Sequence, residues 1–203
     1  MYKKQMILQR ILCYAFILAA TLVFVYSLGL MTDLYENRLG YYAEDYYRYQ
    51  ADPSTLMVPG AEIYYDMQEF NRDFTMAGLI LILLGAAQFV FQNHNRRKYY
   101  IANYITVGVS TVAAVAVSGW ALSNIFTYKE RYVTGVDFES MKMWSEMLKF
   151  SYTESTFWFD ASTVVFGILL VVTALNVVNL VWKVLLMNAE KKLVKAGKEG
   201  KTA

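Results

Sequence analysis

Residues 161–182 read ASTVVFGILLVVTALNVVNLVW, with no charged side chain between Asp160 and Lys183. A helix needs about 20 apolar residues to cross the hydrocarbon core of a bilayer. Because lipid offers no hydrogen-bond partners, the backbone groups of such a segment must be paired within it, as they are in a helix. This stretch is therefore predicted to be a membrane-spanning helix, and it is the feature that decides the fold class.

Three further stretches have the same length and character, and they make the chain a four-span protein. Overall, 57% of the 203 residues are hydrophobic and 18% are charged, against about 25% charged in an average soluble domain. This composition excludes a disordered or nucleic-acid-binding protein. We expect an all-α membrane protein, a single four-helix transmembrane bundle, with spans at about 11–30, 74–91, 100–126 and 161–182, outer loops at 31–73 and 127–160, and a tail at 183–203.

The charges outside the spans predict the orientation. The N-terminus, the link between the second and third spans, and the C-terminal tail together hold twelve basic and two acidic residues, whereas the two long loops hold seven basic and fifteen acidic ones. Short cytoplasmic segments carry the excess of Lys and Arg. Both termini are thus expected in the cytoplasm of a plasma-membrane protein. The absence of cysteines from the loops and of any Asn-x-Ser/Thr sequon favours a bacterial source.

The third span carries a row of small residues at every fourth position: Ala102, Thr106, Ser110, Ala114 and Ser118. Small residues let membrane helices approach each other closely, which substitutes for the missing hydrophobic drive in lipid. Two interpretations follow. The row packs inside the protein's own bundle, or it forms a surface for another subunit.

The fourth span carries Thr173, Asn176 and Asn179 on roughly one face. Amides in lipid form hydrogen bonds with partners on other helices, and Gln88 of the second span is the partner we expect. The row is interpreted as a set of side chains that hydrogen-bond to other helices within the bundle. The alternatives are an interface with a partner subunit and a path for a polar solute. Cys13 is expected to be a small apolar filler, and Lys183 is expected to extend to the membrane surface from the end of its span.

The outer loops are rich in tyrosine and acid. We expect them to pack into an extracytoplasmic cap, with residues 137–148 forming an amphipathic helix capped by Asp137 and residues 56–58 and 61–65 forming a short strand pair. Tyrosine rings with one polar end suit both a cap and a binding interface. The predicted outer binding face, for an extracytoplasmic protein or a glycan, consists of Tyr42, Tyr46, Tyr49, Tyr64, Tyr65 and Trp144.

Catalytic, cofactor and metal motifs are not found. The single histidine, His94, has no cysteine or acidic neighbour with ligand spacing, and no Gly-rich phosphate loop occurs. We therefore expect no enzyme activity, no cofactor, no metal site and no nucleic-acid partner.

The function predicted from these features is that of a non-catalytic accessory or scaffold subunit of a larger plasma-membrane complex. Its partners would be the lipid bilayer and other membrane-protein subunits, and the complex is predicted to be a transporter, such as an ABC-type importer of carbohydrate or another polar solute. Two alternatives stay open at this point. One is a stand-alone, homo-oligomeric small-solute channel or transporter, and the other is a tetraspan adhesion or receptor-like protein.

Overall fold

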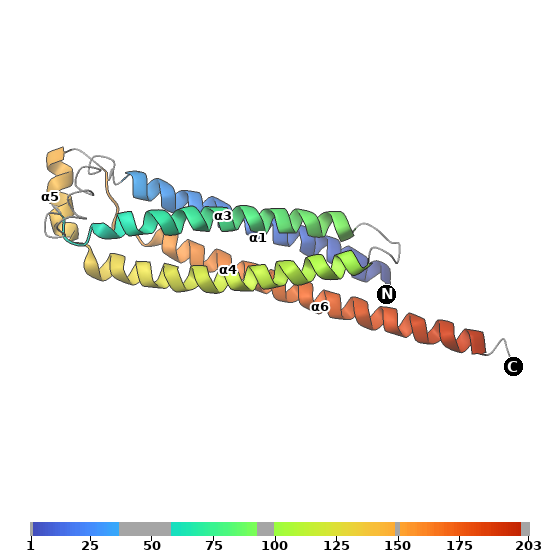
Figure 1. The fold of residues 1–203 in the computed structure, drawn as a ribbon. Coiled ribbons are helices and arrows are strands. Elements are labelled where there is room, and N and C mark those ends of the chain that lie inside the picture. The colour runs from blue at the N-terminus through green and yellow to red at the C-terminus, as the bar shows by residue number, and fades with distance from the viewer. Residues whose placement is uncertain (1, 37–57, 93–99, 149–150, 200–203) are drawn as a thin grey trace. The chain divides into compact units, whose positions relative to one another are not determined.

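A computed structural model describes residues 2–36, 58–92, 100–148 and 151–199. All regular structure in this part of the chain is helical, which confirms the predicted all-α class. Figure 1 shows the helices, four long and one short. They are α1 (Tyr2–Glu36), α3 (Glu62–Gln92), α4 (Tyr100–Gly135), α5 (Phe138–Leu148) and α6 (Phe157–Glu199).

The four long helices are long and apolar enough to cross a membrane, which indicates a multi-pass membrane protein. The helices extend beyond the predicted spans, because α3 begins at Glu62 and α4 continues to Gly135. The strand predicted at 61–65 is therefore wrong. Ile63, Met67 and Phe70 are all buried, and their helical spacing continues an inward-facing stripe beyond the apolar span.

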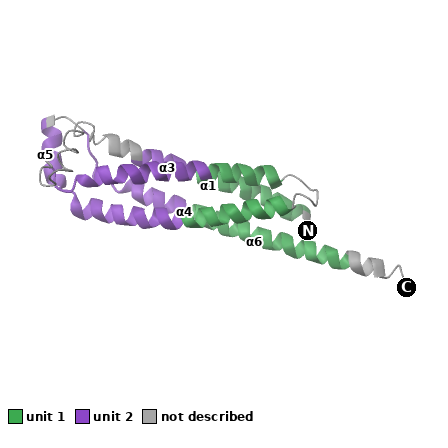
Figure 2. Cartoon of the chain, viewed as in Figure 1, with its two compact units in different colours: residues 1–20, 81–116, 168–203 green, residues 21–80, 117–167 purple. Residues whose placement is uncertain are grey.

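The helices divide into two compact units, shown in Figure 2. Unit 1 comprises residues 1–20, 81–116 and 168–203, and unit 2 comprises residues 21–80 and 117–167. Each unit thus contains a part of α1, α3, α4 and α6, and α5 belongs to unit 2. The two units differ in the chemistry of their interiors.

Unit 2 has an aromatic interior. Phe74 is fully buried and its ring lies against that of Phe166, with centroids 5.4 Å apart. Tyr132 makes edge contacts with Tyr64, at 6.2 Å, and with Phe138 of α5, at 5.2 Å. Such ring pairs add about 0.5–1.5 kcal/mol to the free energy gained from burial alone. The ring of Tyr132 on α4 therefore packs against both α5 and α3.

The start of α5 is fixed by two further interactions, and its predicted cap is confirmed. Asp137 accepts hydrogen bonds from the backbone N–H of Ser140 at 3.1 Å and from its hydroxyl at 2.7 Å. The backbone N–H of Asp137 donates to the carbonyl of Pro59 at 3.0 Å. Gly60 follows with a φ of +82°, and a Cβ there would lie 1.9 Å from the carbonyl oxygen of Gly135. The turn before α3 is thus docked against the junction of α4 and α5, at a position that requires glycine.

The predicted cap over the bundle is not decided by these contacts. Tyr42, Tyr46 and Tyr49 lie in residues 37–57, outside the described part of the chain. His94 lies outside it as well. The contacts around α5 in unit 2 involve the second outer loop and, from the first outer loop, described residues such as Pro59 and Tyr64. A cap built from both loops over the bundle therefore stays a prediction.

Candidate functional site

The interior of unit 1 is lined by polar side chains from all four of its helices. Their common feature is deep burial, with each side chain exposed to 4% or less. On each helix they recur three, four or seven residues apart, which places them on one inward face. We call this set the polar interior: Gln5 and Gln9 on α1, Gln88 and Gln92 on α3, Asn103 and Ser110 on α4, and Thr173, Asn176, Asn179 and Lys183 on α6.

The outer surface of unit 1 is apolar instead. Large aliphatic side chains on every helix of the unit are at least half exposed, among them Ile11, Leu83, Ile105 and Val178. Water-soluble proteins bury such residues and expose their amides. The inverted arrangement fits a unit surrounded by lipid, where amides gain by facing one another.

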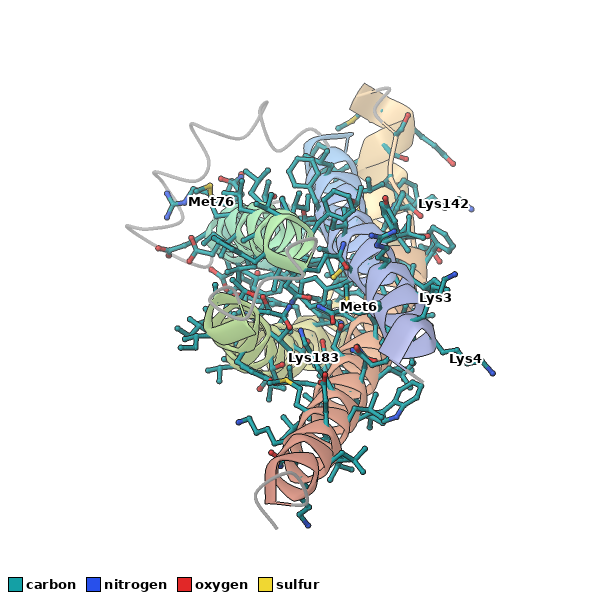
Figure 3. All side chains as sticks on the ribbon, turned by 90° about the vertical axis from the view of Figure 1, so that its right-hand side faces the viewer. Lys3, Lys4, Met6, Met76, Lys142 and Lys183 are labelled. Carbon is teal, nitrogen blue, oxygen red and sulfur yellow. The ribbon has the colours of Figure 1, made fainter. Side chains whose placement is uncertain are left out.

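Lys183 is part of this interior, so the expectation that it extends to the membrane surface is wrong. Its side chain is 3% exposed, and its Nζ donates to the Asn103 Oδ1 atom at 2.8 Å. The Nζ atom also lies 5.7 Å from the centre of the Tyr104 ring, within cation–π range. In Figure 3 Lys183 lies among the helices, whereas Lys3 and Lys4 of α1 extend outward. The reason is that α6 continues to Glu199, so Lys183 shares the inward face with Asn176 and Asn179 rather than ending the helix.

Further hydrogen bonds to side chains of the polar interior involve α1, which contacts α3 and α6. Gln5 Nε2 donates to Gln9 Oε1 at 3.2 Å and to Asn179 Oδ1 at 3.4 Å. The Cys13 thiol, expected to be only an apolar filler, donates to Gln88 Oε1 at 3.9 Å. Asn179 thus pairs with α1 instead of with Gln88 as anticipated, because α1 supplies an amide at its level.

Several polar atoms of this interior have no hydrogen-bond partner among the described residues. They are buried amide atoms on all four helices: Gln5 Oε1, Gln9 Nε2, Gln92 Nε2 and Oε1, Asn103 Nδ2, and Asn176 Nδ2. An unpaired buried donor or acceptor costs about 1–3 kcal/mol. Some of the buried amide groups therefore make no hydrogen bond that would hold the helices together. For this reason we take the polar interior as the candidate site.

The predicted row of small residues on α4 points inward in part. Ser110, Ala114 and Ser118 are buried, and Thr106 is half-buried. The hydroxyl of Ser110 donates to the backbone carbonyl of Thr106 at 2.7 Å. These side chains therefore pack within the chain, in their own units. The row predicted from the sequence lies close to the buried face of α4.

The predicted outer binding face is not assembled by the described residues. Tyr64 is 2% exposed, and its hydroxyl donates to the Sδ atom of Met141 at 3.8 Å. Burial removes Tyr64 from an exposed face and makes it a packing residue of unit 2. Tyr65 and Trp144 are half-buried.

Sequence reasoning missed five members of the polar interior: Gln5, Gln9, Gln92, Asn103 and Lys183. A signal for four of them was present. Gln5 and Gln9 are four residues apart and continue the face of Cys13, and Gln92 follows Gln88 by one turn, while Lys183 follows Asn179 by one turn. They were overlooked because each lies beyond the end of a purely apolar run.

The side chains of the polar interior supply neutral amides, hydroxyls and the ammonium group of Lys183. Within the described ranges, no three His, Cys, Asp or Glu side chains come together in a metal-binding group. Comparisons with sequence-family models, curated proteins and solved structures found no match to this chain.

Proposed function

We propose that the chain is a non-catalytic accessory subunit of a larger membrane complex and that it binds a partner helix through the exposed face of α4. The observation that carries this proposal is the environment of Gly108 and Gly119. Both are exposed, and a Cβ built on either would meet nothing within 4 Å. They lie eleven residues apart in α4, Gly108 in unit 1 and Gly119 in unit 2. Glycines at such positions allow another membrane helix to approach closely.

Two other helical glycines, both on α3, allow a close approach between helices within the chain. A Cβ on Gly78 would lie 2.9 Å from the Phe24 Cα atom in unit 2, and a Cβ on Gly85 would lie 2.8 Å from the Ile17 Cγ1 atom in unit 1. These glycines on α3 bring it close to α1. Among the described residues, Gly108 and Gly119 have no contact of this kind, and neither has Gly167 of α6. The proposal therefore rests on the presence of both Gly108 and Gly119 on α4.

The proposed complex is a transporter, of the ABC importer type for a carbohydrate or another polar solute. A polar interior inside an apolar exterior supports a role beside a polar solute. The positive charge of the N-terminus, the α3–α4 link and the C-terminal tail supports placing both termini in the cytoplasm and the chain in the plasma membrane.

The experiment is purification of the tagged chain from its native membrane in a gentle detergent, followed by mass spectrometry of the chains that purify with it in fixed ratio. We expect a membrane-protein partner with the wild type and its loss with the double variant Gly108→Leu, Gly119→Leu. Added side chains on that face would hold a partner helix away.

The matched control is Gly167→Leu on α6. Gly167 is exposed and has nothing within 4 Å of a built Cβ, so this variant adds the same side chain to another helix. It should keep the partner. A wild-type chain that purifies only as a monomer or homodimer refutes the accessory role, and equal loss of the partner in both variants refutes the α4 face.

A second candidate is a stand-alone, homo-oligomeric small-solute channel or transporter, favoured by the unpaired amides of unit 1. Liposomes that contain only this chain should then show solute flux, and Asn176→Leu should abolish it because it removes a buried amide from the path. An exposed substitution on the same helix, Leu175→Asn, serves as the control. Absence of flux for ions, sugars and amino acids refutes this candidate.

A further inference from the structure

We propose that the polar interior of unit 1 binds a small anion with acceptor oxygens, a phosphate or a carboxylate, between Lys183 and the unpaired amide groups of Gln9, Gln92 and Asn103. This inference does not depend on the accessory role, since a binding site inside unit 1 needs no partner at the α4 face.

Hydrogen bonds between the helices place these groups near the same end of unit 1. Gln5 of α1 reaches Asn179 of α6, and Lys183, one turn further along α6, reaches Asn103 of α4. The position of α3 along α1 follows from the hydrogen bond between Cys13 of α1 and Gln88 of α3. Gln9 lies one turn from Cys13 toward the start of α1, and Gln92 lies one turn from Gln88 toward the end of α3. All four helices thus supply polar groups near the same end of unit 1.

The unpaired atoms are mostly donors. Four are amide nitrogens, on Gln9, Gln92, Asn103 and Asn176, and two are amide oxygens, on Gln5 and Gln92. A ligand with several acceptor oxygens satisfies such a set, whereas a cation or a hydrocarbon would not. The ammonium of Lys183 adds a positive charge beside Asn103, at 2.8 Å. Charge-assisted hydrogen bonds to an anion are roughly twice as strong as neutral ones, so the interior favours an anion over a neutral acceptor.

Glutamine side chains can reorient toward such a ligand by side-chain rotation alone. Gln9 and Gln92 have three side-chain torsions each, and both of their unpaired nitrogens are free to turn toward a new acceptor. Lys183 can keep its bond to the Asn103 Oδ1 atom, since an ammonium has three donors. These donors are buried away from water, and each unpaired donor costs free energy of folding. A bound ligand that accepts their hydrogen bonds would offset this cost.

The test uses the full chain in dodecyl maltoside, with its thermal unfolding measured while sodium phosphate or sodium acetate replaces sodium chloride at constant ionic strength. We expect a saturable rise in Tm with one of these anions, because a ligand that binds only the folded state stabilises it by mass action. Lys183→Met should weaken the binding about 10- to 100-fold, the change that corresponds to one lost hydrogen bond to a charged group. Gln92→Leu should weaken it in the same direction.

The matched control is Lys192→Met, which removes an exposed lysine from the same helix. It should leave the anion response unchanged. Far-UV circular dichroism checks that each variant is folded, and Gln92→Leu tests the site if Lys183→Met is not. Equal weakening by Lys192→Met would show general charge screening and overturn the proposal.

A second arm distinguishes a free anion from a lipid headgroup. Soluble dihexanoyl phosphatidylglycerol and dihexanoyl phosphatidylcholine are titrated in the same assay. A response to the former alone that Lys183→Met removes identifies the anion as an anionic headgroup and supports the site. The absence of any response to phosphate, acetate and both lipids overturns it. Anion binding without solute flux in liposomes leaves the site standing and refutes only the channel.

Discussion

Gly29→Ala is expected to have opposite effects on stability in the presence and absence of the Trp158 ring. A Cβ at Gly29 would lie 2.4, 2.6 and 2.7 Å from three atoms of the Trp158 indole, distances at which something must shift. The ring has little freedom to do so, because Tyr26 packs against it at 5.5 Å and Phe157 at 5.0 Å. Because Gly29 has no side chain, the indole of Trp158 on α6 can pack directly against the backbone of α1 in unit 2.

The magnitude follows from two opposing terms. Replacing Gly by Ala within a helix ordinarily stabilises by about 0.5–1 kcal/mol. Overpacking a close contact costs about 1–3 kcal/mol. The net change in the free energy of unfolding in the wild-type background is thus a loss of roughly 0–2.5 kcal/mol. With Trp158→Leu already present, the clash is absent and the same change should stabilise by about 0.5–1 kcal/mol.

The assay is unfolding by sodium dodecyl sulfate from dodecyl maltoside micelles, followed by circular dichroism, for the four members of the double-mutant cycle. The coupling free energy should be about 1–3 kcal/mol. Gly167→Ala is the control, since that glycine is exposed with open space around it. It should stabilise slightly. If Gly29→Ala lowers the stability equally in both backgrounds, the indole is not what requires glycine at this position.

Three further predictions concern unit 2. Gly60→Ala should lower the Tm, because φ is +82° and the methyl would meet the Gly135 carbonyl at 1.9 Å, whereas Gly135→Ala, with nothing within 4 Å, should leave the Tm nearly unchanged. Gly78→Ala should lower the denaturant midpoint, since its methyl would lie 2.9 Å from a backbone atom of α1 that no side-chain rotation can move. Hydrogen bonds from the Ser140 hydroxyl and backbone N–H hold the pKa of Asp137 in the folded chain below its usual value. The stabilisation of α5 is therefore fully present above the pKa that Asp137 has in the unfolded chain, and it is lost as the pH falls through the lower pKa of the folded chain. Hydrogen exchange of the α5 amides, corrected for intrinsic rate, should accelerate over that acidic range in the wild type, and Asp137→Asn should remove the pH dependence.

The helical class and the number of apolar helices could be predicted from the chain alone. Runs such as 161–182 and 11–30 are too long and too apolar for anything but helices able to span a bilayer, and this property is local. The cap at Asp137 was equally accessible, because it involves side-chain and backbone atoms three residues apart. The ends of the helices could not be predicted in this way. The segment of α3 from Ile63 to Phe70 is amphipathic, so its mean hydropathy is that of a loop although its apolar side chains are buried.

The candidate site was only partly visible. The amides Asn176, Asn179 and Gln88 could be identified because they interrupt apolar runs, and all three are buried in the polar interior. Their partners could not be identified, since a hydrogen bond such as Gln5 to Asn179 joins residues far apart in the chain. Tyr64 shows the opposite failure. Its neighbours suggested an exposed face, but its helix turns it toward α5.

The sequence by itself determined that this is a chain of long apolar helices with a strong charge asymmetry, because hydropathy and charge are summed along short segments. Only the tertiary structure decided that Lys183 faces inward. Its direction depends on how far α6 continues past it and on the amide that α4 presents at its level. A lysine at the end of an apolar run can reach out to water or inward to a partner with the same local sequence. The choice is made by the packing of helices that meet from distant parts of the chain.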